Sequence, residues 1–342
     1  MKVQKRFKDR VIFILYNLVI VFVFLAILEG VIHYWMHHPK AIPGSLLKVI
    51  RAYYAEHVRS TIQMEPECAI YDPDLFYTLK PGKSTFENLE FKINLYVNTK
   101  GVRDDEQSLD HPKVIFLGDS FTMGWGIDQD STFESRIQRA LGYTTLNAGI
   151  SSYGTVRELK ILNRFNLDSL KTIVIQYHFS DLGENRDFAN HHDSLIISSP
   201  EKYQQTSTIV RKRSKYYFGK HTSLVAKMIV KKMIGRLLDR PITNAEDVRY
   251  FIHSLQTSDV PLDKFKIVVF EVASHGEKGN TFIEELKKEI TKTEYPDYIR
   301  NMKVVDVQPK LTERDYYIID DHINTSGHKI VSRELLNAIQ TP

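Results

Sequence analysis

Strand-like and helix-like patterns of apolar residues alternate along the chain from residue 112 onward. Short apolar runs predict strands at residues 114–117, 144–147, 172–177, 265–271 and 302–306. Stretches with helical periodicity predict helices at residues 131–141, 155–166, 245–256, 281–291 and 326–339. The first strand is apolar at every position, which is typical of a strand buried on both faces. The pattern therefore predicts an α/β domain over residues 112–342, with a parallel sheet and helices on both faces.

The longest apolar run, residues 11–28, is broken only by Tyr16 and Asn17. A helix of this length spans about 27 Å, close to the hydrocarbon thickness of a bilayer. Five basic residues and one acid precede the run, and Tyr34 and Trp35 follow it. The positive-inside rule places the amino terminus in the cytoplasm and the later residues on the periplasmic side. A cleavable signal peptide is the alternative, but no small-x-small motif ends the run. We therefore expect residues 1–36 to form a basic tip and a retained, single-pass transmembrane anchor.

Two further regions flank or interrupt the α/β domain. Residues 37–111 are expected to form a helical stalk and then a small β-containing appendage, because residues 91–97 alternate between apolar and polar. An insertion at about residues 186–244 separates the third and fourth strands. From residue 211 onward it contains the basic residues Arg211, Lys212, Arg213, Lys215, Lys220, Lys227, Lys231, Lys232, Arg236 and Arg240. Its apolar residues at helical spacing are Val225, Met228, Ile229, Met233, Ile234, Leu237 and Leu238.

This basic amphipathic pattern has two interpretations. The helix could lie near anionic lipid head groups or acidic glycan. Alternatively, it could pack its apolar face on the domain and leave its lysines in solvent, and we favour this second interpretation.

Composition narrows the class of protein. The chain has 42% hydrophobic and 26% charged residues, which is typical of a globular protein. Its net charge of +4 equals that of residues 1–10 alone, so the remaining chain is balanced and gives no argument for nucleic-acid binding. The single Cys68 excludes an intramolecular disulfide. No ligand cluster at a known metal spacing accompanies His191-His192-Asp193, so neither a metal nor a cofactor is expected. The sequence carries no signal for an oligomeric state.

Candidate catalytic residues lie at the two ends of the α/β domain. Ser120 follows the first strand, at the edge of the sheet where parallel α/β proteins place reactive groups. A serine needs a base and an orienting acid, and His322 and Asp320 offer both. The alternatives are ordinary helix caps, since Asp and Ser are favoured at such positions.

These residues form motifs that resemble the SGNH/GDSL hydrolase superfamily. Gly118-Asp119-Ser120 is similar to its first block, and Asp-x-His-x-Asn-x-x-Gly-His at 320–328 is similar to its last. Residues 147–155 and 177–181 occupy the places of its second and third blocks. The resemblance implies a flavodoxin-like sheet, with Ser120 as nucleophile, His322 as base and Asp320 as the orienting acid.

The resemblance also implies an oxyanion hole, and here the sequence departs from the family pattern. The hole would include Ser120 and a second-block donor, for which Ser152 stands at the glycine position and Gly149 is nearby. The third-block asparagine is replaced by Ser180, and Asn185 is a possible substitute donor. Losing one oxyanion donor typically costs about 10²–10³ in rate.

The spacing of the acid and the base is a further difference. Asp320 lies two residues before His322, whereas the family often has the acid three residues before, at the position of Ile319. The shorter spacing is similar to membrane-associated O-acetyltransferases that modify alginate.

We therefore expect a serine esterase that acts through an acyl-serine on an acylated cell-envelope glycan or lipid, outside the cytoplasmic membrane. An O-acyltransferase acting on an extracellular polysaccharide is the first alternative. A catalytically weak, glycan-binding homologue is the second, because of Ser180.

Overall fold

The computed structural model describes residues 2–235, 244–277, 279 and 281–341. The chain divides into two compact units. Residues 1–59 and 214–240 form the first, called the helical unit here, and residues 60–213 and 241–342 form the second, called the sheet unit. The sequence placed the whole insertion in the α/β domain, whereas its second half groups with the amino-terminal helices.

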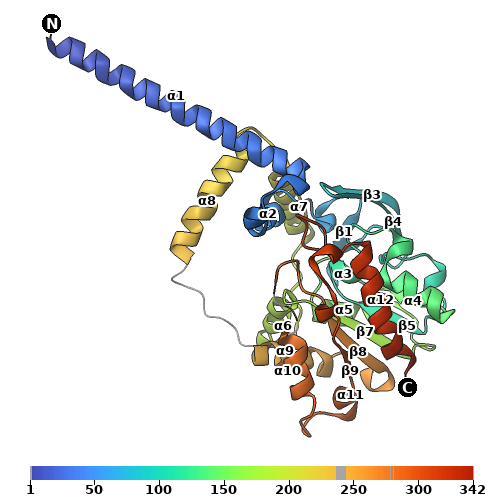
Figure 1. The fold of residues 1–342 in the computed structure, drawn as a ribbon. Helices are drawn as coiled ribbons and strands as arrows, with labels where there is room; N and C mark the ends of the chain where they lie inside the picture. The colour runs from blue at the N-terminus through green and yellow to red at the C-terminus, as the bar shows by residue number, and fades with distance from the viewer. Residues whose placement is uncertain (1, 236–243, 278, 280, 342) are drawn as a thin grey trace. The chain divides into compact units, whose positions relative to one another are not determined.

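A parallel sheet of five strands is the centre of the sheet unit (Figure 1). In spatial order the strands are β6 (Thr145–Asn147), β5 (Val114–Leu117), β7 (Thr172–Tyr177), β8 (Lys266–Glu271) and β9 (Lys303–Val305). Counted along the chain this order is 2-1-3-4-5, which is the flavodoxin-like arrangement. The register places Ile115 of β5 beside Ile173 of β7 and Leu146 of β6. The predicted fold class is confirmed.

Helices cover both faces of this sheet, as the apolar strands require. Val114 and Phe116 of β5 share a core with α4 (Phe133–Leu141) and α12 (Thr325–Gln340). Ile115 and Leu117 face the other core, with α5, α9 and α10. The bounds of those three helices are Thr155–Lys160, Asn244–Gln256 and Thr281–Glu289. Alternate residues of one strand thus bury on opposite sides.

Most differences from the predicted elements concern short helices. The helix expected at 155–166 ends as an α-helix at Lys160 and continues as a 3₁₀ turn over Ile161–Arg164. The structure adds α3 (Ser120–Met123), α6 (Asp181–Asn190) and α11 (Asp297–Arg300), and it shows α7 at Pro200–Ser214 inside the insertion. The one-turn helices α3 and α11 are too short to show a periodicity in the sequence. Local caps and tertiary contacts decide whether such helices form.

Two antiparallel hairpins form the predicted β appendage. The first pairs β1 (Ala69–Asp72) with β2 (Phe76–Leu79), and the second pairs β3 (Gly82–Asn88) with β4 (Phe91–Val97). Along β4, Ile93, Leu95 and Val97 are buried while the residues between them are exposed, as the alternation predicts. The buried residues share a core with Met123 and Trp125 of the α/β region, so the second hairpin packs directly on the segment after Ser120.

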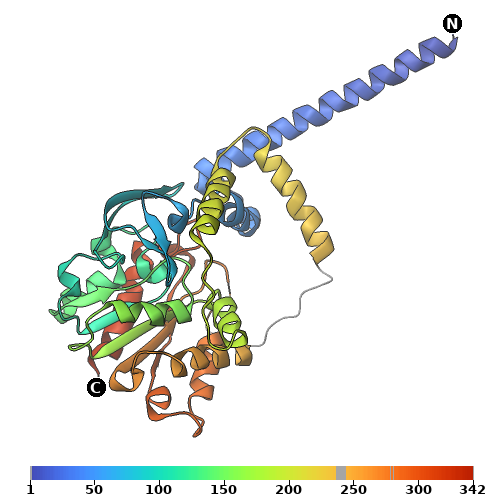
Figure 2. The same ribbon diagram turned by 180° about the vertical axis from the view of Figure 1, so that it is seen from behind.

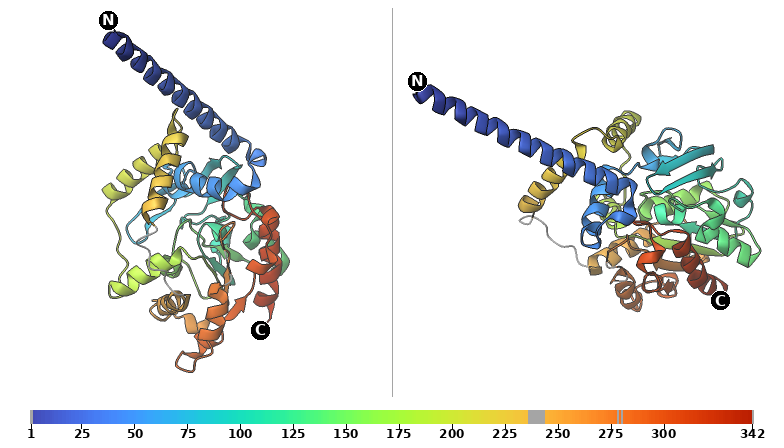
Figure 3. Two further views of the ribbon diagram at one scale, coloured as in Figure 1. Left: turned by 60° about the vertical axis from the view of Figure 1, so that its left-hand side comes forward. Right: turned by 45° about the horizontal axis from the view of Figure 1, so that its top comes forward.

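The helical unit contains α1 (Lys2–His37), α2 (Gly44–His57) and α8 (Lys220–Gly235). Helix α1 is long and apolar enough to cross a membrane. On α2, Ile50, Tyr53 and Tyr54 are buried, whereas Leu46 is exposed. Helix α8 contacts α1 and then diverges from it (Figures 2 and 3). The predicted residues Arg236, Leu237, Leu238 and Arg240 lie outside the described part of the chain.

Candidate active site

Ser120 is positioned by a tight junction between β5 and α3. Gly118 has a φ of 153°, and a Cβ there would lie 2.7 Å from Gln176 Oε1 and closer still to Thr122 Oγ1, so only glycine fits. The Asp119 carboxylate accepts the N–H of Phe121 at 2.9 Å and caps α3. Ser120 is therefore the first residue of a helix at the carboxyl end of a central strand.

The three predicted catalytic residues lie in one hydrogen-bonded chain. Ser120 Oγ is 2.7 Å from His322 Nε2, and His322 Nδ1 is 2.6 Å from Asp320 Oδ1. A carboxylate only accepts hydrogen bonds, so His322 carries its proton on Nδ1. In the neutral imidazole, Nε2 then has a lone pair directed at the Ser120 hydroxyl. This is the nucleophile, base and acid geometry of serine hydrolases.

A second carboxylate, Asp321, also faces the imidazole. Its Oδ1 lies 3.1 Å from His322 Nδ1. Burial lowers the pKa of His322, but the charges of Asp320 and Asp321 and their hydrogen bonds outweigh burial and raise it to about 9. The sequence analysis missed Asp321, although the consecutive acids before the histidine were visible in the sequence.

Trp125 and Glu90 support the acid from two sides. Trp125 Nε1–H donates to Asp320 Oδ2 at 3.1 Å, and its indole stacks on the His322 ring with centroids 4.8 Å apart. The Glu90 carboxylate accepts the backbone N–H groups of Ile318, Ile319 and Asp320 at 2.8, 2.8 and 2.7 Å. Sequence reasoning missed both residues, because each acts on a segment about two hundred residues away.

The structure separates the two second-block candidates for the oxyanion hole. The Gly149 N–H donates to Asn147 Oδ1 at 3.1 Å, and a Cβ on Gly149 would lie 2.5 Å from Met123 N, so this glycine is packed against α3. Ser152 has a φ of 60°, a conformation that favours glycine, and its Oγ accepts a hydrogen bond from Gln63. Its backbone N–H has no partner among the described residues. Ser152 is the better of the two candidates.

The third-block candidates also have different surroundings. Asn185 is fully buried, and its Nδ2 donates to Thr155 Oγ1 at 3.1 Å, so its amide is engaged in the core. Ser180 is exposed and precedes α6, and its Oγ is 2.7 Å from His178 Nδ1. His178 lies beside Phe121, with ring centroids 5.3 Å apart.

His178 links Ser180 to Asp321, one of the two carboxylates beside His322. The Ser180 N–H donates to His178 Nδ1 at 3.3 Å, so the ring proton is on Nε2. Nε2 lies 3.1 Å from Ser274 Oγ, whose hydroxyl donates to Asp321 Oδ2 at 3.5 Å. A hydrogen-bond network therefore runs from the third block to the second carboxylate beside His322.

The acids and the histidine also form a set of potential metal ligands. One ligand atom each from Asp320, Asp321 and His322 lies within 4.8 Å of the others. The separation of 2.6 Å between His322 Nδ1 and Asp320 Oδ1 leaves room for a proton but not for a cation between them. We therefore interpret this group as a hydrogen-bonded acid–base pair.

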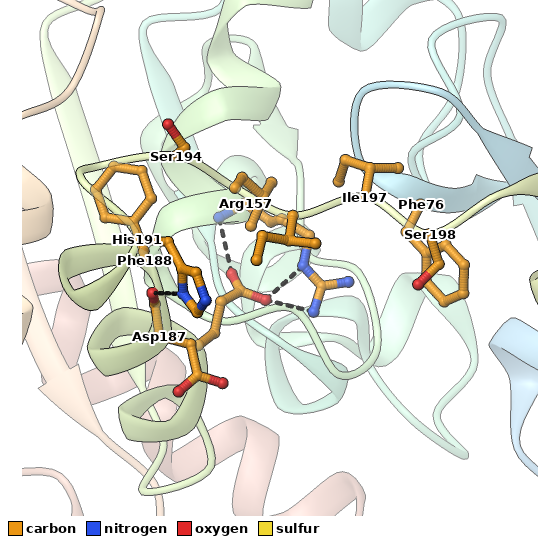
Figure 4. Close-up of a pocket in the computed structure, with 11 residues that line it drawn as sticks. Phe76, Arg157, Asp187, Phe188, His191, Ser194, Ile197 and Ser198 are labelled. Carbon is orange, nitrogen blue, oxygen red and sulfur yellow. Dashed lines mark hydrogen bonds and ion pairs between the residues drawn. The ribbon is translucent and has the colours of Figure 1, made fainter.

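A pocket of about 420 Å³ lies beside the second block (Figure 4). Arg157 and Glu184 line it and form an ion pair, with Arg157 Nε 2.5 Å from Glu184 Oε2. Arg157 Nη2 also donates to the Ser152 carbonyl at 3.3 Å, which links the pocket wall to the candidate oxyanion donor. Phe76, Phe188 and His191 add aromatic faces, whereas Ser120 and His322 do not line the pocket.

Solved structures similar to this chain are lipolytic proteins and carbohydrate esterases. A G-D-S-L family lipolytic protein from Veillonella parvula DSM 2008 is 10% identical, with 67% of this chain and 98% of that chain covered and a TM-score of 0.40. A family two carbohydrate esterase from Cellvibrio japonicus is 12% identical, with 67% and 60% covered and a TM-score of 0.36. No family model and no curated protein matches the sequence.

Proposed function

We propose that this protein is a serine-dependent esterase that removes acyl groups from a cell-envelope glycan or lipid. The observation that carries the proposal is the continuous hydrogen-bonded chain from Ser120 through His322 to Asp320. Ser120 lies 202 residues before His322 in the sequence, and the fold brings its hydroxyl to the imidazole near the carboxyl end of β5. If these residues were only helix caps, the serine hydroxyl would have no reason to face an imidazole that two carboxylates orient.

The geometry supports a two-step acyl transfer. Ser120 Oγ attacks the ester carbonyl while His322 Nε2 takes the hydroxyl proton, and the tetrahedral oxyanion is held by the N–H groups of Ser120 and Ser152. The C–O bond to the alcohol then breaks, and the alcohol leaves with the proton from His322. Water then attacks the carbonyl of the acyl-serine while His322 Nε2 takes its proton. The bond to Ser120 Oγ breaks, the serine regains that proton, and the acid is released.

Helix α1 supports a location at the membrane. Its apolar stretch is long enough to cross a bilayer, and the basic residues before it favour a cytoplasmic amino terminus. The esterase would then act on the periplasmic side. The pocket beside Ser152 offers aromatic faces and the charged Arg157 and Glu184, which suit a sugar ring, and aliphatic side chains of residues 195–197, which suit an acyl group.

An O-acyltransferase is the second candidate. The two-residue spacing between Asp320 and His322 favours it, and the same acyl-serine serves both reactions. The acceptor alone differs, because a sugar hydroxyl replaces water in the second step.

Hydrolysis of a chromogenic acetyl ester by the full-length protein in detergent tests the proposal. We expect Ser120→Ala to lower kcat by roughly 10³-fold or more, and Ser332→Ala on α12 to have no effect. Equal background rates with the wild type and Ser120→Ala would contradict the enzyme and favour a glycan-binding homologue. With an added oligosaccharide, an acetylated sugar in place of free acetate, measured by mass spectrometry, would identify the transferase.

A further inference from the structure

Three consecutive aromatic residues project into solvent just before α8. Tyr216, Tyr217 and Phe218 have exposed fractions of 47%, 59% and 66%. Exposed large apolar side chains normally occur singly on a protein surface, and a contiguous group marks an interaction site. We call Lys215 and these three aromatic residues, that is residues 215–218, the aromatic loop.

The aromatic loop is held in shape by its own chain. Lys220 is only 2% exposed, and its ammonium donates to the carbonyls of Ser214 and Lys215 at 3.1 and 3.0 Å. Gly219, with a φ of 85°, makes the turn into α8. Burying the charged Lys220 ammonium costs free energy, and its two hydrogen bonds to the loop carbonyls offset that cost. These bonds fix the backbone of the loop in the conformation that exposes the rings.

Two contacts fix this loop to the end of the apolar stretch of α1. Glu29, the first residue after the run 11–28, accepts the backbone N–H groups of His221 and Thr222 at 3.2 and 2.8 Å. One turn further along α1, the His33 ring packs on Tyr216 with centroids 4.3 Å apart. The aromatic loop therefore lies level with the residues of α1 that follow the apolar run.

We propose that the aromatic loop is a second membrane contact, in which Tyr217 and Phe218 enter the interfacial region of a phospholipid bilayer. This inference rests on the proposed membrane anchoring by α1. Aromatic rings favour the head-group level of bilayers, which is the level that Glu29 and His33 fix for the loop. Helix α8 continues away from α1 rather than along it (Figures 2 and 3), so it runs over the membrane surface.

The positive charges near the aromatic loop also fit a phospholipid bilayer. Lys215 precedes the rings, and Lys227 lies on α8, and both are exposed. Lysines beside an inserted aromatic group extend their ammonium groups to lipid phosphates and are attracted to an anionic surface. The loop thus supplies rings for the interface and ammonium groups for the phosphates. The contact would orient the helical unit about the axis of α1, which a single spanning helix does not do.

Site-directed spin labelling tests the contact, because Cys68 is the only cysteine and is buried. Full-length Cys68→Ser protein is reconstituted in vesicles of phosphatidylcholine and phosphatidylglycerol. Single labels are placed at Phe218→Cys, at Val19→Cys in the apolar run and at Lys40→Cys beyond the end of α1. Collision rates with oxygen and with a water-soluble nickel complex report immersion.

We expect the Phe218 label to be immersed, with nickel collisions several-fold fewer than at Lys40. Nickel access at Phe218 equal to that at Lys40, with Val19 immersed, would overturn the contact while leaving the anchor intact. An aqueous Val19 label would overturn the anchor and the contact together. Protection of the Phe218 label from both reagents would show a protein partner instead and would also overturn it.

Lys215→Glu with Lys227→Glu should raise nickel access at Phe218, and unchanged access would contradict the role of the lysines.

Discussion

At the residue scale, the imidazole of the candidate base faces two acids rather than one. Asp320 is fully buried and bonded by Trp125, whereas Asp321 is partly exposed and bonded through Ser274 to His178. Both carboxylates stabilise the imidazolium that forms when Ser120 loses its proton. They also make the resting imidazole a stronger base, since the pKa of His322 is raised to about 9.

This raised pKa predicts an alkaline activity profile. Only the neutral imidazole accepts the Ser120 proton, so kcat/KM should rise with pH and level off above about 9. Asp321→Asn removes one of the charges that raise the pKa, so the midpoint should move to lower pH. Ester hydrolysis measured across this range checks the shift, with Asp297→Asn on the exposed α11 as a control. An unchanged midpoint in Asp321→Asn would contradict this account of the site.

Sequence reasoning reached the residues that lie at the ends of predicted elements. Ser120 lies three residues after Leu117, where β5 ends, and Asp320 and His322 lie within five residues of the start of α12, so local patterns were enough to select them. The oxyanion candidates depend on the direction of a backbone N–H, which no residue pattern encodes. Asn185 illustrates the limit, because it follows Ser180 closely in sequence but its side chain is bonded inside the core.

At the element scale, the second hairpin is part of the site rather than a separate appendage. Phe86 and Phe91 pack on Trp125 with ring centroids 5.0 and 5.9 Å apart, and Trp125 in turn stacks on His322. Glu90 lies in the turn between the two strands and holds three backbone N–H groups of the segment before His322. The hairpin therefore supports the acid through Glu90 and the base through Trp125.

A substitution of Glu90 tests this role of the hairpin. Glu90→Gln keeps the side-chain size but leaves one carbonyl oxygen for three N–H donors, so Asp320 should shift slightly. We expect kcat to fall by roughly 10- to 100-fold with KM unchanged, which is the cost of a small displacement at the reacting group. Glu87→Gln, on the same hairpin and paired with Lys92 at the surface, is the matched control. Equal kcat values for the two variants would show that the hairpin only packs against the domain.

The strands were predictable at this scale, and the second half of the insertion was not. The strands of the sheet are mostly apolar runs, and β5, buried at every position, has no polar residue to interrupt the pattern. Helix α8 has a basic amphipathic pattern that fits either a cap on the domain or a surface beside the membrane. The grouping of α8 with α1 depends on Glu29, a single residue whose role only tertiary structure reveals.

At the scale of the whole molecule, a pair of buried carboxyl groups supports the junction of α4, β6 and the segment before β5. Glu134 accepts the Thr145 hydroxyl, and Asp104 accepts the Asn147 N–H at 2.9 Å. Burial raises the pKa of Asp104 to about 6. Burial and the charge of Asp104 together raise the pKa of Glu134 to about 8. Both groups are thus held in a site that favours their neutral forms.

The stability of the sheet unit should therefore decrease as pH rises. Below the ordinary carboxyl pKa both states bind these protons, but between there and about 8 the unfolded chain releases the Glu134 proton while the folded chain retains it. Each such proton lowers the free energy of unfolding by about 1.4 kcal/mol per pH unit. Glu134→Gln should remove this part of the slope, because its neutral amide does not titrate. Urea unfolding across this range, with Glu201→Gln on α7 as an exposed control, measures the slopes. Parallel slopes for the wild type and Glu134→Gln would mean that the buried pair is ionised in the fold, and its partners would then have to stabilise two adjacent negative charges.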